Sequence, residues 1–167
     1  NDPTIKPVGP IMQFLQLNIE MYRSNQRLTA THPYSSKWYS WPFMARPIYY
    51  WVQEQARIYL LGNPIVWWGS TAALLAVIAS ILLTGIRRTD PTLSFLAGAW
   101  MLNVLPFIGI NRVMFLYHYF TGLIWAVLIL AYLISKLHPY HRDRVAIGMV
   151  ATAAALFIFF APLSYGL

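Results

Sequence analysis

Four long apolar segments fill the second part of the chain, and they constrain its fold more than any other feature. They are predicted at about residues 65–86, 91–110, 113–137 and 145–165. Each segment approaches the ~20 apolar residues that cross a hydrocarbon core about 30 Å thick. The connections between them are very short, so successive helices must be antiparallel neighbours. We therefore predict that residues 65–167 form a domain of four transmembrane helices.

The composition agrees with a membrane protein. Of the 167 residues, 58% are hydrophobic and 10% are charged, whereas soluble domains carry about 25% charged residues. The net charge of +7 could indicate a nucleic-acid partner, but the basic residues are scattered at the ends of segments, where they suit anionic lipid. The predicted partner is therefore the lipid bilayer and not nucleic acid. The chain has no cysteine, which excludes disulfides, thiolate nucleophiles and cysteine metal sites.

Residues 1–64 are predicted to form an outer-face unit of interfacial helices and an aromatic-rich loop. Apolar residues recur at helical spacing in 11–28, with polar residues between them, which indicates an amphipathic helix lying on the membrane. Residues 48–61 are predicted as a second short helix that ends at the sequence Gly-Asn-Pro, residues 62–64. The predicted fold class is thus an all-α membrane protein. The first ten residues lack the features of a signal peptide, so we expect either that a preceding segment was removed or that the chain is part of a longer one.

The segment HPYSSKWYSWPFMARPIYYW, residues 32–51, carries many aromatic residues between its prolines. Aromatic rings at this density suit a membrane–water interface, and the prolines prevent a continuous helix. We expect an ordered element over the outer ends of the helices, with Trp41 and Trp51 largely buried. The predicted interface aromatic anchors are Trp38, Trp41, Trp51, Trp67 and Trp68.

The charges of the short loops predict the orientation. One side of the four segments carries most of the basic loop residues, namely Arg87, Arg88, Lys136, Arg142 and Arg144. Cytoplasmic loops carry an excess of Lys and Arg, so this side is predicted to be cytoplasmic. Residues 1–64 and the C-terminus are then expected on the periplasmic or lumenal side of the membrane.

Three separated motifs of the chain resemble one known family. They are HPYSS…W…WP…RPIYYW within 32–51, IYLLGNP…WW at 58–68 and NRVMFLYHY at 111–119. Over about residues 11–165 the chain is similar to the C-terminal four-transmembrane region of the protein O-mannosyltransferases. The resemblance implies an enzyme that moves mannose from polyprenyl- or dolichyl-phosphate-mannose to a serine or threonine of a protein. It also implies that the catalytic Asp-Glu pair lies in an earlier part of the enzyme, so this chain contains no catalytic residue and should be inactive alone.

The candidate residues for binding a lipid phosphate, or the donor side of the reaction, are Arg112, His118, Tyr119 and Arg46. Arg112 is predicted at the outer end of the third span, with His118 about 1.5 helical turns deeper. A cation and a histidine at the membrane rim suit a lipid phosphate. Alternatively, Arg112 reaches to lipid headgroups and His118 bonds a neighbouring helix. For Arg46 the favoured role is structural, as a cation–π contact on Trp41 or Trp38.

No metal site is predicted in the chain. His138 and His141 lie three residues apart, but Pro139 should prevent a regular helix there and no third ligand is near. Asp90 precedes Pro91 at the start of a span, which predicts a helix N-cap rather than a catalytic carboxylate.

A second function also fits the sequence. The chain could be a non-catalytic small subunit or scaffold, derived from the same family, in a larger bioenergetic or photosynthetic membrane complex. His118 could then ligate a pigment or haem as a neutral imidazole. In either case the expected partners are other membrane polypeptides or an N-terminal half that precedes this region.

Overall fold

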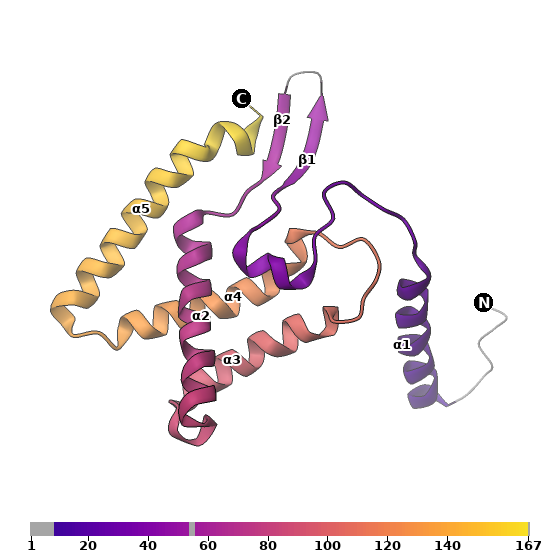
Figure 1. The fold of residues 1–167 in the computed structure, drawn as a ribbon, viewed down its shortest axis with the longest axis horizontal. Coiled ribbons are helices and arrows are strands. Elements are labelled where there is room, and N and C mark those ends of the chain that lie inside the picture. The colour runs from indigo at the N-terminus through magenta and orange to yellow at the C-terminus, as the bar shows by residue number, and fades with distance from the viewer. Residues whose placement is uncertain (1–8, 54–55, 167) are drawn as a thin grey trace.

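A computed structural model describes residues 9–53 and 56–166 of the chain. The molecule is mostly helical, with one two-stranded hairpin (Figure 1). Its helices are α1 (Pro10–Arg27), α2 (Pro64–Thr84), α3 (Pro91–Val104), α4 (Phe120–Ser135) and α5 (Pro139–Tyr165), and its strands are β1 (Ile48–Gln53) and β2 (Ala56–Leu60). Four short 3-10 helices join them: η1 (Trp38–Phe43), η2 (Ile86–Arg88), η3 (Leu105–Phe107) and η4 (Leu116–Tyr119).

In the described part of the chain, three helical segments are long and apolar enough to cross a membrane. They are Pro64–Thr84, Leu116–Ser135 and Pro139–Tyr165, and the segment Pro91–Phe107 is apolar but shorter. The second predicted span, 91–110, is therefore too long. The α-helix ends at Val104, because Pro106 has no N–H to continue the hydrogen-bond ladder and its ring crowds the preceding turn.

The start of the third predicted span is also wrong. Residues 111–115 form a loop, and the regular helix α4 begins only at Phe120, after the 3-10 turn η4. Arg112 and His118 are therefore not stacked on one helix at helical spacing.

Pro139 does not prevent a helix, contrary to the prediction. It occupies the first turn of α5, where a missing N–H is harmless and a fixed φ favours the helix. The side chain of His138 caps this helix by accepting the N–H of Tyr140 at 3.4 Å. The fourth helix consequently starts before its predicted apolar segment, with its charged residues in the first turns.

The short helix predicted at 48–61 is instead the hairpin β1–β2, so the fold is not all-α. The two strands are antiparallel, with Tyr49 opposite Tyr59 and a bulge between Tyr49 and Trp51. Aromatic and β-branched residues fit a pleated, half-buried surface and stabilise it through cross-strand pairs. The sequence at 62–64 does not end a helix but starts one, since Asn63 is the N-cap of α2 and Pro64 follows it.

Helices α2, α3 and α4 share one buried core. Helix α4 packs against both α2 and α3, while α5 contacts α2, α4 and strand β2 (Figure 1). The buried core residues are Ala73, Leu74, Val77, Leu96, Ala97, Ala126 and Ile129. No residue of α5 is buried, so most of its apolar surface is free to face lipid or another polypeptide.

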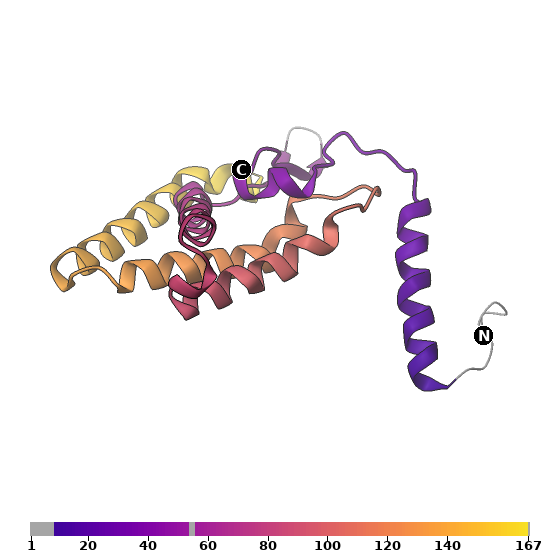
Figure 2. The same cartoon turned by 60° about the horizontal axis from the view of Figure 1, so that its bottom comes forward.

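Helix α1 stands apart from the other helices (Figures 1 and 2), and side chains of its last turn contact the loop 109–112. It has the predicted amphipathic pattern, but none of its residues is buried. Its apolar side chains, among them Ile11, Phe14 and Met21, are mostly exposed. Packing against the rest of the described chain therefore does not explain the apolar face of this helix.

Candidate anion-binding cleft

The 3-10 helix η1 is held tightly on the first turns of α2. The Trp41 side chain is fully buried, and its indole N–H donates to the Ser36 hydroxyl at 2.9 Å. From α2, the Trp67 indole N–H donates to the Trp41 carbonyl at 2.8 Å and the Thr71 hydroxyl donates to the Pro42 carbonyl at 2.6 Å. Because these donors and acceptors are buried, they place the aromatic segment in one orientation.

The loop before η4 lies beside this segment. The backbone N–H of Ser36 donates to the carbonyl of Met114 at 2.8 Å. Trp41 and Met114 belong to one buried cluster with Trp67 and Tyr119. Residues 30–46 and 111–114 are thus brought together, although the helices α2 and α3 separate them in sequence.

An open cleft of about 450 Å³ lies between these two segments. Of the described residues that line it, three are basic, none is acidic, and several carry hydroxyl groups. The basic residues are Lys37, Arg46 and Arg112, and the hydroxyl groups belong to Thr31, Ser35, Ser36, Tyr39 and Ser40. Guanidinium, ammonium and hydroxyl groups are the donors that bind phosphate and carboxylate oxygens, so this cleft is suited to an anion.

Two of the predicted donor-side residues are therefore close together. The Arg46 guanidinium donates to the Ser35 carbonyl at 3.1 Å, and Arg112 donates to Asn25 Oδ1 at 2.9 Å. The cation–π contacts within residues 9–53 and 56–166 are made by Arg57, Lys136 and Arg144 rather than by Arg46. Within the described part of the chain, each arginine of the cleft thus donates to one neutral oxygen, and a guanidinium has five N–H groups in all.

The other two predicted residues lie behind the cleft and do not line it. The His118 ring stacks on Trp41, with ring centroids 5.8 Å apart, and its Nδ1 contacts the backbone of Phe115. Tyr119 is fully buried, and its hydroxyl accepts the indole N–H of Trp100 at 3.1 Å. His118 and Tyr119 thus belong to the packed side chains that support the cleft.

The five predicted anchor tryptophans differ in burial. Trp38 is partly buried and packs against the cluster that contains Trp41 and Trp67. Trp41 and Trp67 are buried and join η1 to α2. Trp51 and Trp68 are about half exposed, which for Trp51 differs from the expected burial. An anchoring role at a membrane interface stays a prediction and suits these exposed rings best.

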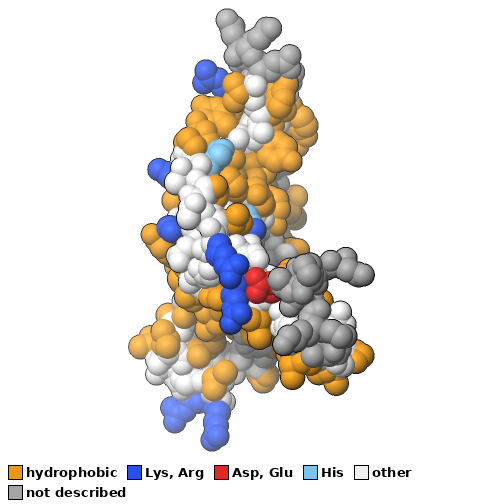
Figure 3. All heavy atoms as spheres, turned by 90° about the vertical axis from the view of Figure 1, so that its right-hand side faces the viewer, with side chains coloured by type: hydrophobic (Ala, Val, Ile, Leu, Met, Phe, Trp, Pro, Cys, Tyr) orange, Lys and Arg blue, Asp and Glu red, His pale blue; other side chains and the backbone are white. Residues whose placement is uncertain are grey.

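The face of the molecule on the α1 side shows many Lys and Arg side chains and few acidic ones (Figure 3). The carboxylates in the described part of the chain are all engaged. Glu20 pairs with Arg27, Asp143 pairs with its neighbour Arg142, and Asp90 caps α3 by accepting the N–H of Thr92. Asp2 and Glu54 lie outside the described residues. Among the described residues that line the cleft, none carries a carboxylate.

Residues 10–167 match the protein family described as "C-terminal four TMM region of protein-O-mannosyltransferase". The chain belongs to this family. Dolichyl-phosphate-mannose–protein mannosyltransferase 1 of Candida albicans is 32% identical over 139 residues, which cover 74% of this chain and 16% of that protein. The enzyme of the same name from Saccharomyces cerevisiae is 29% identical over 96% of this chain and 22% of its own length.

The fold of this mannosyltransferase region is also found in a solved structure. The S. cerevisiae protein O-mannosyltransferase Pmt1-Pmt2 complex bound to the sugar donor matches with a TM-score of 0.75 and 27% identity, over 97% of this chain and 25% of the other. The chain thus spans about a fifth of the length of the curated relatives and a quarter of the solved chain.

Sequence reasoning about the mannosyltransferase region missed several residues of the cleft. Lys37 and the hydroxyl groups around it were visible only as parts of the aromatic segment. Asn25, the partner of Arg112, lies 87 residues away in the chain. No local pattern marks such a contact, because it depends on how α1 is placed against the loop 109–112.

Proposed function

We propose that this chain is the C-terminal membrane region of a lipid-carrier-dependent protein O-mannosyltransferase, and that its basic cleft binds the phosphate of a polyprenyl- or dolichyl-phosphate-mannose donor. The observation that carries this proposal is the grouping of Lys37, Arg46 and Arg112 around one open cleft, whose described lining includes no acidic residue. Names of relatives in this family mention dolichyl-phosphate-mannose, which is a lipid carrying a phosphate.

The position of the cleft supports this ligand. It lies at the loop end of the helices, between the segment before α2 and the loop between α3 and α4. A lipid-linked phosphate is held at the level of the membrane headgroups, while its chain stays in the hydrocarbon. Basic side chains at such a rim can bind the headgroup charge without entering the apolar core.

Four crossings of the membrane fit the alternating order of the helices. We propose that α3, extended by η3 to Phe107, is the fourth and shortest crossing beside the three long helices. In this arrangement residues 1–64, the cleft and the C-terminus share the periplasmic or lumenal side. The basic residues Arg87, Arg88 and Lys136 would then lie on the cytoplasmic side.

The chemical step itself belongs to another part of the enzyme in this proposal. Displacement of a lipid phosphate by a hydroxyl group needs a base, usually a carboxylate. Among the described residues every carboxylate is engaged in an ion pair or a helix cap away from the cleft. This region would therefore bind and orient the donor, and an earlier segment or a partner polypeptide would supply the base.

Equilibrium binding of dolichyl phosphate to the full-length protein in detergent tests the cleft. Replacing Arg112 or Arg46 by Gln removes a charged hydrogen-bond donor, and we expect each variant to bind at least tenfold more weakly, about 1.4 kcal/mol. Arg88→Gln, a matched change at an exposed arginine far from the cleft, should leave the affinity unchanged. Equal affinities for the three variants, with unchanged thermal stability, would refute the assignment of the phosphate to this cleft.

A further inference from the structure

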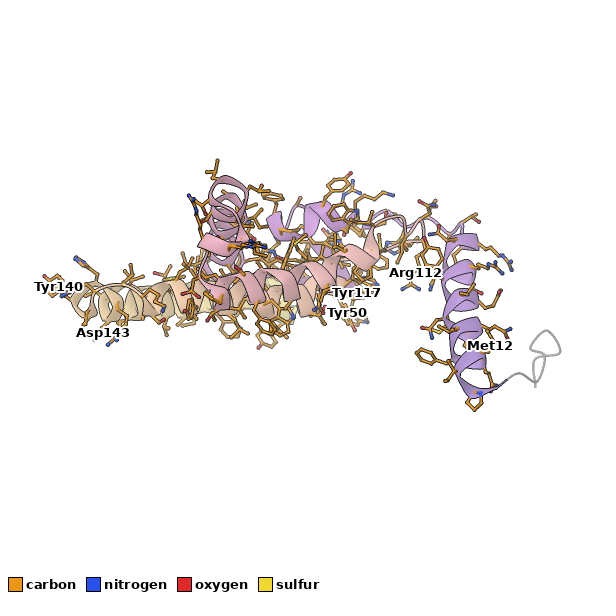
Figure 4. All side chains as sticks on the ribbon, turned by 90° about the horizontal axis from the view of Figure 1, so that it is seen from below. Met12, Tyr50, Arg112, Tyr117, Tyr140 and Asp143 are labelled. Atoms are coloured by element: carbon orange, nitrogen blue, oxygen red, sulfur yellow. The ribbon has the colours of Figure 1, made fainter. Side chains whose placement is uncertain are left out.

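The last turn of α1 is pinned to the loop that carries Arg112. The Gln26 side chain donates to the carbonyl of Gly109 and accepts from the Asn111 amide at 3.1 Å. One residue earlier, Asn25 Oδ1 accepts from the Arg112 guanidinium at 2.9 Å. Since no residue of α1 is buried, these polar contacts hold the helix against the loop. Figure 4 shows Arg112 at this junction and Met12 near the opposite end of α1.

The orientation of the Asn25 side chain is determined by its own helix. Its Nδ2 group donates to the carbonyl of Met21 at 2.9 Å, one helical turn earlier. This bond directs the amide oxygen away from the helix carbonyl and toward Arg112. An amide has one acceptor oxygen and one NH₂ group, so the two partners together use both sides of the Asn25 amide.

The amide also suits Arg112 electrostatically. Asn25 is neutral, so it fixes one guanidinium N–H group without cancelling the positive charge. An aspartate at this position would form an ion pair and would compete with an anionic ligand. Asn25 does not line the cleft, whereas Arg112 does, so Asn25 acts on a ligand only through Arg112.

We propose that Asn25 is a positioning residue, which holds the Arg112 guanidinium in the direction required to bind the lipid phosphate. Helix α1 thereby becomes part of the donor site without touching the donor. This inference rests on the function proposed for the cleft. It adds that the placement of α1 controls the affinity for the phosphate.

The helix offers a matched control for the test. Asn18 makes the same local hydrogen bond as Asn25, from its Nδ2 group to the carbonyl of Phe14 at 2.8 Å, but it has no contact with Arg112. In the full-length protein, Asn25→Ala should weaken equilibrium binding of dolichyl phosphate about tenfold, as expected for loss of a hydrogen bond to a charged group. Asn25→Asp should weaken binding at least as much, and Asn18→Ala should leave it within twofold of wild type.

A double-mutant cycle separates positioning from a general structural effect. In a background of Arg112→Gln, the further change Asn25→Ala should give no additional loss of affinity, because its effect passes through Arg112. Full additivity of the two losses, or equal affinities of Asn25→Ala and Asn18→Ala, would overturn the positioning role while leaving the cleft assignment intact. If Arg112→Gln alone binds dolichyl phosphate normally, the positioning role fails, and the cleft assignment fails as well if Arg46→Gln also binds normally.

Discussion

The indole N–H of Trp67 donates to the main-chain carbonyl of Trp41 at 2.8 Å, across 26 residues of sequence. Both rings are buried. The contact ties the aromatic segment before the hairpin to the first turns of α2, next to the cleft. Because the same carbonyl also accepts the N–H of Met44 at 2.9 Å, the oxygen remains bonded if the indole is lost.

This packing predicts how three tryptophan substitutions rank in their effect on the free energy of unfolding. Trp41→Ala should lower the free energy of unfolding by about 3–5 kcal/mol, since it leaves a large cavity. Trp67→Phe keeps most of the ring and should cost about 1 kcal/mol for the hydrogen bond. Trp51→Ala, at a half-exposed ring, is the control and should cost less than either. Unfolding in detergent, followed by circular dichroism, measures these differences, and a small effect of Trp41→Ala would contradict the buried position of η1.

Gly62 is predicted to be intolerant of any side chain. A Cβ atom at this position would overlap the Trp67 ring and approach the Met44 sulfur closely. We expect Gly62→Ala to destabilise the protein by about 1–3 kcal/mol, as other cases of overpacking do.

Gly148 provides the matched comparison for Gly62. It lies within α5, and a Cβ atom there would meet nothing within 4 Å. Alanine favours a helix interior over glycine by about 0.5–1 kcal/mol, so Gly148→Ala should be neutral or stabilising. Similar effects of the two substitutions on the unfolding midpoint would show that the close packing at Gly62 is not present.

The hydrogen bonds of the Asp90 carboxylate predict that the protein loses stability at acidic pH. The Tyr132 hydroxyl donates to its carboxylate at 2.9 Å and is the main cause that lowers the pKa of Asp90, with the capping N–H of Thr92 adding to it. A pKa lowered by folding contributes stability above the unfolded value of about 3.9, and this stability is lost as pH falls through the folded pKa.

Unfolding midpoints measured between about pH 2 and pH 6 test this expectation. Asp90→Asn keeps an N-cap residue but cannot titrate, so its midpoint should fall less at the acidic end than that of the wild type. Tyr132→Phe should raise the pKa of Asp90 toward its usual range and shift the loss to higher pH. Parallel acid profiles for the wild type and Asp90→Asn would rule out a contribution from this carboxylate.

The proposed topology predicts opposite accessibility of two surface positions. Thr29 lies between α1 and η1, and Arg88 lies in the turn between α2 and α3. This region has no cysteine, so Thr29→Cys and Arg88→Cys each introduce one thiol here. In sealed, oriented vesicles, a membrane-impermeant maleimide should label Thr29→Cys from the lumenal or periplasmic side and Arg88→Cys from the cytoplasmic side. Labelling of both from one side would exclude the four-crossing arrangement.

The sequence by itself determined the features that depend on local chemistry. The apolar segments showed a membrane protein because ~20 apolar residues in a row need a hydrocarbon environment. Asp90 before Pro91 marked the start of α3, because an N-cap and its proline act within one turn. Three motifs indicated the family. They lie in the aromatic segment, at 58–68 and at 111–119.

Only the tertiary structure decided the features that depend on contacts between residues far apart in the sequence. Residues 48–53 and 56–60 become paired strands because each strand supplies the other's hydrogen bonds, and β2 is further packed on α5. His118 and Tyr119 share a motif with Arg112 but are turned into the packing by the 3-10 turn η4. Arg46, Lys37 and Arg112 meet in one cleft, and Asn25 reaches Arg112, only when α1, η1 and the loop before η4 are assembled. Such contacts join residues far apart in the chain, so no local pattern could specify them.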